Sequence, residues 1–340
     1  MLLGHGNHTL GMEHRIKVDF SSNIWYGSLN GGLISYLETC LNQIRDYPPV
    51  DAANLQASIA RHHQLHPDNV CITSGATEAF YLIAHCFRQC SSTIISPSFS
   101  EYEDAAKVHM HKVSYYENTN LSKESKFSNQ LVWLGNPNNP DAKVLSLKTI
   151  EYLLKNNPES IFIIDEAYGE LCSDFESSVG LVDKYDRLIV VKSVTKFCSI
   201  PGLRLGYLVA SNKLRDKIAA FRMPWSVSTL ALEAGMYIYD RYVDFKMDLK
   251  RVTQECSAFK NMIEEIDGIT VYPSRTNYFL AKLESSNARE LKGYLIENYG
   301  FLIRDCSNFY GLDERYFRLS VQGNNNNMAC SKAIYQYLNR

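Results

Sequence analysis

Short apolar segments alternate with longer segments of helical periodicity between residues 69 and 222 of this 340-residue chain. A strand that is apolar throughout must be buried on both faces, and helical connections between such strands favour parallel pairing. We therefore predict an α/β fold with a mostly parallel, doubly wound sheet. The predicted strands are 69–74, 92–97, 112–116, 130–135, 160–165, 187–193 and 205–210, and the predicted helices are 52–64, 77–89, 99–109, 147–156 and 212–222.

The pattern changes near residue 225. A long helical segment over 228–265 leads into several short strand-like segments and two further helical ones, which predicts a smaller α+β unit. The N-terminal residues show no periodicity and predict an arm lying across another surface. We accordingly divide the chain into an arm packing on the small domain (1–30), a large domain (31–225) and a small C-terminal domain (226–340).

Charge and residue usage exclude several classes of function. The formal net charge of −2 gives no reason to expect a nucleic-acid or acidic-membrane partner. Nine irregularly spaced cysteines without a CxxC pair are typical of a reduced cytoplasmic protein, and no apolar run approaches the ~18 residues of a membrane helix. All nine histidines lie between His5 and His111, without metal-type spacing. We expect a cytoplasmic enzyme with no metal.

Polar side chains stand at the carboxyl ends of the predicted strands, where open α/β sheets bind ligands. Strand 69–74 runs into "SGATEAF", a helix start whose free amides favour a phosphate, and strand 130–135 ends in "GNPNNPDA". Strand 160–165 ends in Asp165, and Lys196 and Arg204 follow strand 187–193. Each feature alone could be an ordinary helix start or a rigid Asn-Pro turn. Their occurrence at successive strand ends favours a single site.

This combination meets the requirements of pyridoxal phosphate chemistry. A lysine amine must bond to the cofactor aldehyde, and burial assists by lowering its pKa from about 10.4. A carboxylate must keep the pyridine nitrogen protonated, so that the ring can accept the electrons of a breaking bond at Cα. Further donors must hold the ring oxygen and the phosphate. Lys196 and Asp165 are the candidates for the amine and the carboxylate.

At these positions the chain resembles fold-type I pyridoxal-phosphate enzymes of the aminotransferase class I/II superfamily. The resemblance covers essentially the whole chain. The segments that carry it are "RDYPP", "TSGATEAF", "SPSFSEY", "GNPNNP", "IIDEAYGE", "SVTKFCSIPGLRLGY", "MPWSVS", "YPSRTNYFL" and "YFRLS". It implies a large cofactor-binding domain followed by a smaller domain, with pyridoxal 5'-phosphate as cofactor.

The resemblance also assigns roles around the cofactor ring. It makes Lys196 the Schiff-base lysine and Asp165 the partner of the pyridine nitrogen. Two residues would hold the ring oxygen: Asn139 and Tyr168. Phe99 would stack on the ring, and Tyr102, three residues further on, is the alternative.

Other assigned residues would bind the cofactor phosphate. Within one subunit these are Gly75, Ala76, Thr77, Ser193 and Arg204. Tyr47 would reach the phosphate of a neighbouring subunit, which implies a homodimer; a surface turn residue before Pro48 is the alternative. The family pattern differs at two places: Asp141-Ala142 stands where Thr-Gly is usual, and Lys192 replaces a common arginine.

Two subfamilies fit the C-terminal segments, and both act on an amino compound that carries a phosphate. These are threonine-phosphate decarboxylase of the cobalamin pathway and histidinol-phosphate aminotransferase. The superfamily resemblance makes Arg318 the residue that would bind a substrate carboxylate bidentately. In both subfamilies Arg304 would be a second substrate arginine, unless it is only a surface residue.

Two segments resemble the decarboxylase more closely than the aminotransferase. They are "IRDCSNFYGLDERYFRLSV" and the N-terminal "HGN" followed by "DFSSNI". In that family His5 would reach the substrate phosphate and Asn23 would line the pocket, although "WYGS" replaces the usual continuation of the arm. We therefore predict an L-threonine O-3-phosphate decarboxylase. A phosphate-directed aminotransferase is the alternative, and a non-catalytic relative the second, which the intact Lys196 and Asp165 disfavour.

Overall fold

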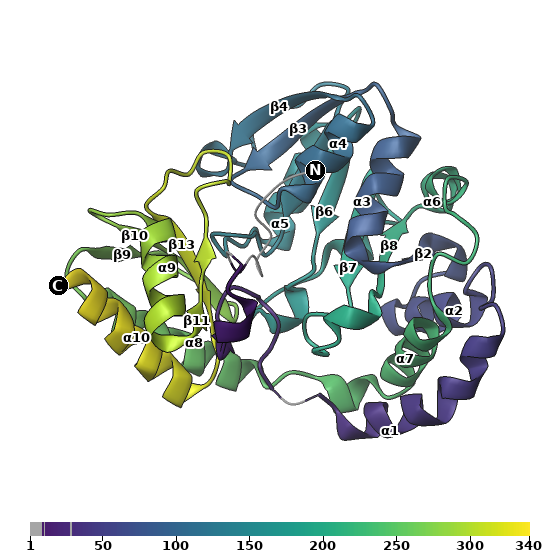
Figure 1. Ribbon diagram of the computed structural model, residues 1–340. Coiled ribbons are helices and arrows are strands. Elements are labelled where there is room, and N and C mark those ends of the chain that lie inside the picture. The colour runs from purple at the N-terminus through teal and green to yellow at the C-terminus, as the bar shows by residue number, and fades with distance from the viewer. Residues whose placement is uncertain (1–8, 10, 28) are drawn as a thin grey trace.

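The computed structural model describes residues 9, 11–27 and 29–340, and its largest element is a seven-stranded sheet (Figure 1). The strand order is β2-β8-β7-β6-β5-β3-β4; β8 runs antiparallel to both of its neighbours, and the remaining pairs are parallel. The predicted mostly parallel sheet is therefore confirmed. Its strands are β2 (Val70–Thr73), β3 (Ser91–Ser96), β4 (Lys112–Glu117), β5 (Leu131–Gly135), β6 (Ile161–Asp165), β7 (Leu188–Ser193) and β8 (Gly206–Ala210).

Helices cover both faces of this sheet because successive strand residues point to opposite sides. On β7, Leu188 and Val190 join one hydrophobic core, whereas Ile189 and Val191 join another. The helices of the first core are α2 (Ala53–His63), α5 (Leu147–Asn156) and α7 (Thr229–Asp240), with α1 (Gly31–Cys40) packed on α7. The helices of the second core are α3 (Gly75–Cys86), α4 (Glu101–Val108) and α6 (Asn212–Ala219).

A smaller unit stands beside the large sheet, in the green and yellow C-terminal part of Figure 1. It contains a four-stranded antiparallel sheet of order β12-β13-β10-β9. Its strands and helices are β9 (Ile269–Val271), β10 (Tyr278–Leu283), β12 (Arg304–Asp305), β13 (Tyr316–Ser320), α8 (Leu249–Glu264), α9 (Ala288–Tyr299) and α10 (Asn324–Leu338). The N-terminal strand β1 (Val18–Asp19) pairs with β11 (Phe301–Leu302), and Phe20 is buried in the core of this unit.

Two sequence-based assignments were wrong in detail. The predicted helix over 228–265 is two helices, separated by a 3-10 turn at Tyr242–Phe245. The second helix starts afresh because the Asp248 side chain accepts a hydrogen bond from the Arg251 amide and so caps its N-terminus. One of the short strand-like segments after residue 265, "FLIRD" (301–305), is divided between β11 and β12, which pair with different partners. The domain boundary at 225–226 stays a prediction, although the packing of α7 in the large core favours a boundary nearer α8.

Candidate active site

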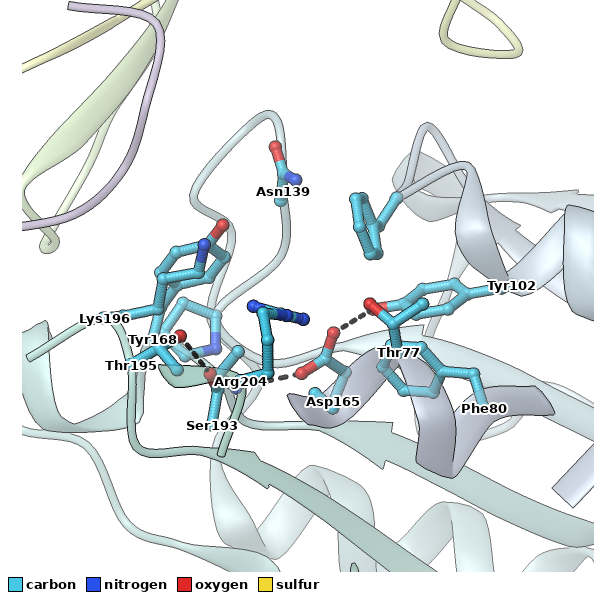
Figure 2. Close-up of a pocket in the computed structure, with 14 residues that line it drawn as sticks. Thr77, Phe80, Tyr102, Asn139, Asp165, Tyr168, Ser193, Thr195, Lys196 and Arg204 are labelled. Atoms are coloured by element: carbon cyan, nitrogen blue, oxygen red, sulfur yellow. Dashed lines mark hydrogen bonds between the residues drawn. The ribbon is translucent and has the colours of Figure 1, made fainter. Parts of the chain in front are cut away.

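A cavity lies beyond the carboxyl ends of β6 and β7, at the start of α3 (Figure 2). It contains nine of the eleven residues predicted to bind the cofactor; Gly75 lies directly beside it and Tyr47 lies elsewhere. Its lining residues are Ala76, Thr77, Phe80, Phe99, Tyr102, Pro137, Asn139, Asp165, Ala167, Tyr168, Ser193, Thr195, Lys196 and Arg204. Segments at the carboxyl ends of five strands, β2, β3, β5, β6 and β7, therefore meet where the sequence analysis placed a single site.

Asp165 is the buried carboxylate of this cavity. It ends β6, where its Oδ2 accepts a hydrogen bond from the Tyr102 hydroxyl (2.7 Å) and its Oδ1 accepts one from the Ala167 amide (2.9 Å). Burial raises the pKa of Asp165, while these hydrogen bonds and the charge of Lys196 act in the opposite direction. A buried carboxylate held in this way is suited to pair with a cationic nitrogen of a bound group.

The ring of Tyr102 is already engaged. It stacks on Trp133 at 6.1 Å between ring centroids, and its hydroxyl is bonded to Asp165. Phe99 lies edge-on to Tyr102 and lines both this cavity and the adjoining one. This arrangement favours Phe99 as the ring that would stack on the cofactor, with Tyr102 as a support for the carboxylate.

The phosphate-type region lies where α3 begins. Gly75 has a φ of +77°, and a Cβ at this position would overlap the guanidinium of Arg204. The Arg204 Nη1 group donates a hydrogen bond to the carbonyl of Pro201 (3.0 Å), and its guanidinium points into the cavity in Figure 2. The hydroxyls of Ser193 and Thr195 lie 2.9 Å apart on the same wall. Helix amides, two hydroxyls and a cation together form a donor set that suits a phosphate.

Lys196 stands across the cavity from Asp165, close to two further predicted residues (Figure 2). Its Nζ lies 5.9 Å from the ring centroid of Tyr168. The side-chain oxygen of Asn139 accepts a hydrogen bond from Arg318 Nη1, which leaves the Asn139 amide NH₂ as a donor. The amine, the amide and the phenol therefore converge on one space.

A second cavity adjoins the first and shares Phe99, Asn139, Tyr168, Lys196 and Arg204 with it. Its outer wall carries Arg304 and Arg318, which are directly opposite each other on the antiparallel strands β12 and β13. Arg304 Nη2 donates to Asn308 Oδ1 (2.8 Å), and its guanidinium lies 5.0 Å from the ring centroid of Phe309. Burial lowers the pKa of Arg304 to about 10, and the nearby charge of Arg318 acts in the same direction.

Asn23 completes this second cavity from the N-terminal segment. It is buried, and neither its Nδ2 nor its Oδ1 has a hydrogen-bond partner among the described residues. Arg318 Nη2 donates to the carbonyl of Ser21 (2.5 Å), while Arg318 Nε has no partner within the described chain. Buried polar atoms without partners are costly, so this cavity is suited to a polar, anionic ligand.

Among the described residues, Tyr47 is the predicted site residue that lies away from these cavities. His5 lies outside the described residues. Tyr47 is 82% exposed and packs against Trp225, with 5.0 Å between ring centroids. Within the part of the chain that the structure describes, no group of three His, Cys, Asp or Glu side chains could hold a metal ion, and no helix has the length and apolarity to cross a membrane.

The sequence analysis gave no role to Thr195 of the first cavity and considered Tyr102 only as an alternative stacking ring. Thr195 lies next to Ser193 in "SVTK", so its place in the motif was a usable signal. The hydrogen bond from Tyr102 to Asp165 joins residues 63 positions apart, and no local sequence pattern predicts it.

The fold and this arrangement define a fold-type I pyridoxal-phosphate enzyme. The chain belongs to the aminotransferase class I and II family, whose model matches residues 16–332, and its cofactor is pyridoxal 5'-phosphate. The cavity fits this group, because Gly75 leaves open the space beside Arg204 that a Cβ would fill, and Asp165 offers a buried acceptor. The predicted resemblance to this family is confirmed.

Relatives of both predicted kinds are found. The chain is 28% identical over 326 residues to threonine-phosphate decarboxylase of Salmonella typhimurium, covering 92% of this chain and 89% of the relative. The crystal structure of L-threonine-O-3-phosphate decarboxylase from Porphyromonas gingivalis matches with a TM-score of 0.91 at 36% identity, covering 94% of this chain and 99% of that one. The histidinol-phosphate aminotransferase from Clostridium acetobutylicum matches with a TM-score of 0.84 at 26% identity, covering 94% and 98%.

Proposed function

We propose that this protein is an L-threonine O-3-phosphate decarboxylase that forms (R)-1-aminopropan-2-yl phosphate for cobalamin biosynthesis. The observation that carries the proposal is the pair Arg304 and Arg318, which face one cavity from opposite positions on β12 and β13. Two adjacent buried cations suit a substrate with two anionic groups, here a carboxylate and a phosphate. The similarity to two threonine-phosphate decarboxylases supports the same choice.

Each site residue then has a defined task. The cofactor, when bound, supplies an electron sink for the bond that breaks at Cα. Asp165 keeps the ring nitrogen protonated; the α3 amides, Ser193 and Arg204 hold the phosphate of the cofactor. Arg318 would bind the substrate carboxylate, Arg304 would bind the substrate phosphate, and Asn23 would offer its unpaired amide to the substrate.

Decarboxylation and transamination differ in which bond at Cα breaks, and the residues that orient the substrate would decide this. In the proposed reaction the bond to the carboxylate carbon would break, and the carboxylate would leave as carbon dioxide. Lys196 Nζ would donate the proton that replaces it at Cα. In the alternative, a histidinol-phosphate aminotransferase, the Cα–H bond would break instead, and the same lysine would move that proton.

One pair of assays tests the choice. Purified protein is given L-threonine O-3-phosphate, and we expect carbon dioxide and aminopropanol phosphate without an oxo acid. In parallel it is given histidinol phosphate with 2-oxoglutarate, and formation of glutamate is measured. Glutamate formed in the second assay, with no product in the first, would refute the decarboxylase and favour the aminotransferase. Product in neither assay would favour a non-catalytic relative.

The cofactor assignment has its own test. A Lys196→Ala variant is expected to lose the visible absorption of the lysine-bound cofactor and all turnover. If that absorption remains unchanged in the variant, Lys196 is not the cofactor lysine, whatever the substrate.

We further propose that the protein acts in the cytoplasm as a homodimer in which Tyr47 reaches the cofactor phosphate of the partner. The exposed Tyr47 lines a surface groove with Trp225 and the turn before α7, outside its own active site. A hybrid dimer of one Lys196→Ala and one Tyr47→Ala subunit tests this. If Tyr47 acts across the interface, the hybrid keeps one intact site and regains activity that neither parent has. If it acts within its own subunit, no activity returns.

A further inference from the structure

Lys192 is a buried lysine on β7 for which the cofactor and substrate sites provide no role. Its side chain is 4% exposed, and the next residue along β7 is Ser193. Because successive residues of a strand point to opposite faces, Ser193 faces the cavity and Lys192 faces the core formed with α2, α5 and α7. Lys192 Nζ lies 2.7 Å from Glu170 Oε1 and 3.4 Å from Glu166 Oε2. We call Lys192, Glu166 and Glu170 the charged triad.

The charged triad is tightly held. Burial raises the pKa of Glu166, while the charge of Lys192 and the hydrogen bonds to Glu166 act in the opposite direction. Burial by itself lowers the pKa of Lys192, but the two carboxylates outweigh it and raise this pKa above its ordinary value. Glu166 is fully buried, and its oxygens accept hydrogen bonds from the Ser177 hydroxyl (2.5 Å) and the Ser178 amide (2.6 Å). Three charged groups in a core need such partners to be tolerated.

The two carboxylates of the triad belong to the segment that carries Asp165 and Tyr168. Glu166 directly follows Asp165, and Glu170 lies two residues beyond Tyr168. Lys192 belongs instead to the segment that leads to Lys196. The triad therefore joins the two chain segments that supply opposite walls of the active-site cavity.

Side chains provide this connection where the backbone no longer does. The β6–β7 ladder ends with Asp165 opposite Val191, and the Glu166 amide then donates to the Val191 carbonyl (2.8 Å). Beyond that bond, no backbone hydrogen bond joins residues 167–172 to residues 192–196, all of which the structure describes. At the point where the sheet ends, the triad continues the link between its two central strands.

We propose that the charged triad is a positioning device, which holds Asp165 and Tyr168 in register with Lys196 across the cavity. A buried ion pair contributes little net stability compared with an apolar replacement, and in some proteins such a pair instead specifies one arrangement of its partners. The proposal concerns the cofactor site and not the choice of substrate. Its main measurement is therefore the cofactor signal, which an incorrect substrate assignment would leave untouched.

The test compares three variants of the holoenzyme. Lys192→Met removes the cation and leaves the buried carboxylate of Glu166 and the partly buried carboxylate of Glu170 without it, so stability and function should both fall. Lys192→Arg can still bind both carboxylates and should restore the wild-type properties to within about threefold. The triple variant Lys192→Met/Glu166→Gln/Glu170→Gln removes all three charges with little change of volume, and should fold with a Tm near that of the wild type.

In the triple variant we expect the visible circular dichroism of the bound cofactor to decrease clearly. We also expect kcat to fall on the order of 10²-fold, because displacements of about 1 Å at a reacting centre have effects of this size. Lys184→Met is the matched control, since it breaks the exposed Lys184–Glu151 ion pair. The control should change neither the dichroism nor kcat.

Wild-type dichroism and kcat in the stable triple variant would overturn the proposal and leave the triad a purely structural ion pair. Failure of Lys192→Arg to recover the signal would also overturn it. A loss of the cofactor signal in Lys184→Met as large as that in the triple variant would do the same, because the effect would then not be specific to the triad.

Discussion

Replacing Arg304 by methionine should make the ligand-free protein slightly more stable and a much poorer enzyme. Burial lowers the pKa of Arg304 to about 10 from its ordinary value of 12.5. One pKa unit corresponds to about 1.4 kcal/mol, so the charged form is about 3 kcal/mol less favourable here than in the unfolded chain. A cation whose native pKa is lowered destabilises the native state at every pH below that pKa. Removing the charge therefore stabilises the protein at neutral pH.

Two lost contacts offset part of this gain. The hydrogen bond from Arg304 to Asn308 and the contact with the ring of Phe309 each contribute about 1 kcal/mol. The net expectation is a stabilisation of about 1 kcal/mol in urea unfolding of the ligand-free protein at pH 7.5. Arg304 has no carboxylate in salt-bridge contact among the described residues, so its buried charge is a stability cost that an anionic substrate would remove.

The effect on catalysis has the opposite sign. If Arg304 donates two charge-assisted hydrogen bonds to the substrate phosphate, removing them should cost about 3 kcal/mol of binding free energy. This corresponds to a roughly 10²-fold decrease in kcat/KM. The assay is release of carbon dioxide from L-threonine O-3-phosphate, with L-threonine as the unphosphorylated comparison. The preference for the phosphorylated compound should fall by the same roughly 10²-fold factor, because only that compound carries the group that Arg304 is proposed to bind.

Arg315→Met is the matched control, since Arg315 lies just before β13 and its partly exposed side chain pairs with Asp313. It should leave the substrate preference unchanged and alter stability by less than about 1 kcal/mol. The reasoning on Arg304 is refuted if Arg304→Met lowers the stability of the ligand-free protein while the preference for the phosphorylated substrate persists.

Two further predictions concern the cofactor cavity. Tyr102→Phe removes a hydrogen bond that lowers the pKa of Asp165, so this pKa, already raised by burial, should rise further. When burial raises the pKa of an acid in the native state, the native state binds more protons than the unfolded state at any pH between the unfolded and native pKa values. The free energy of unfolding therefore falls as pH rises through this range. Cofactor-free Tyr102→Phe should therefore lose more stability than the wild type as pH rises from 4; superimposable pH curves in urea unfolding would contradict this. Gly75→Ala places a methyl group against the Arg204 guanidinium at a φ of +77°, and should raise the cofactor dissociation constant at least about tenfold in absorbance titrations. Gly202→Ala, where a Cβ meets open space, is its control, and equal effects of the two variants would show that the cradle is not the cause.

The sequence by itself was sufficient for the class of fold and for most of the cofactor cavity. Apolar strands alternating with helices require a sheet covered on both sides, and the carboxyl ends of such strands form one edge. Asp165, Ser193 and Lys196 lie at or near those ends, so their convergence followed from local pattern alone. Roles could be proposed for these residues from the sequence because the motifs around them are contiguous.

Only the tertiary structure decided the contacts between distant segments. Arg304 lies opposite Arg318 because β12 and β13 pair antiparallel, a register that their separate motifs do not encode. The sequence gives Lys192 no role, whereas the fold places it in contact with Glu166 and Glu170. Ionic and hydrogen-bond partners of this kind depend on burial and distance, which arise from the packing of the whole chain. A linear motif can name the reacting residues, whereas the groups that hold and tune them are determined by the fold.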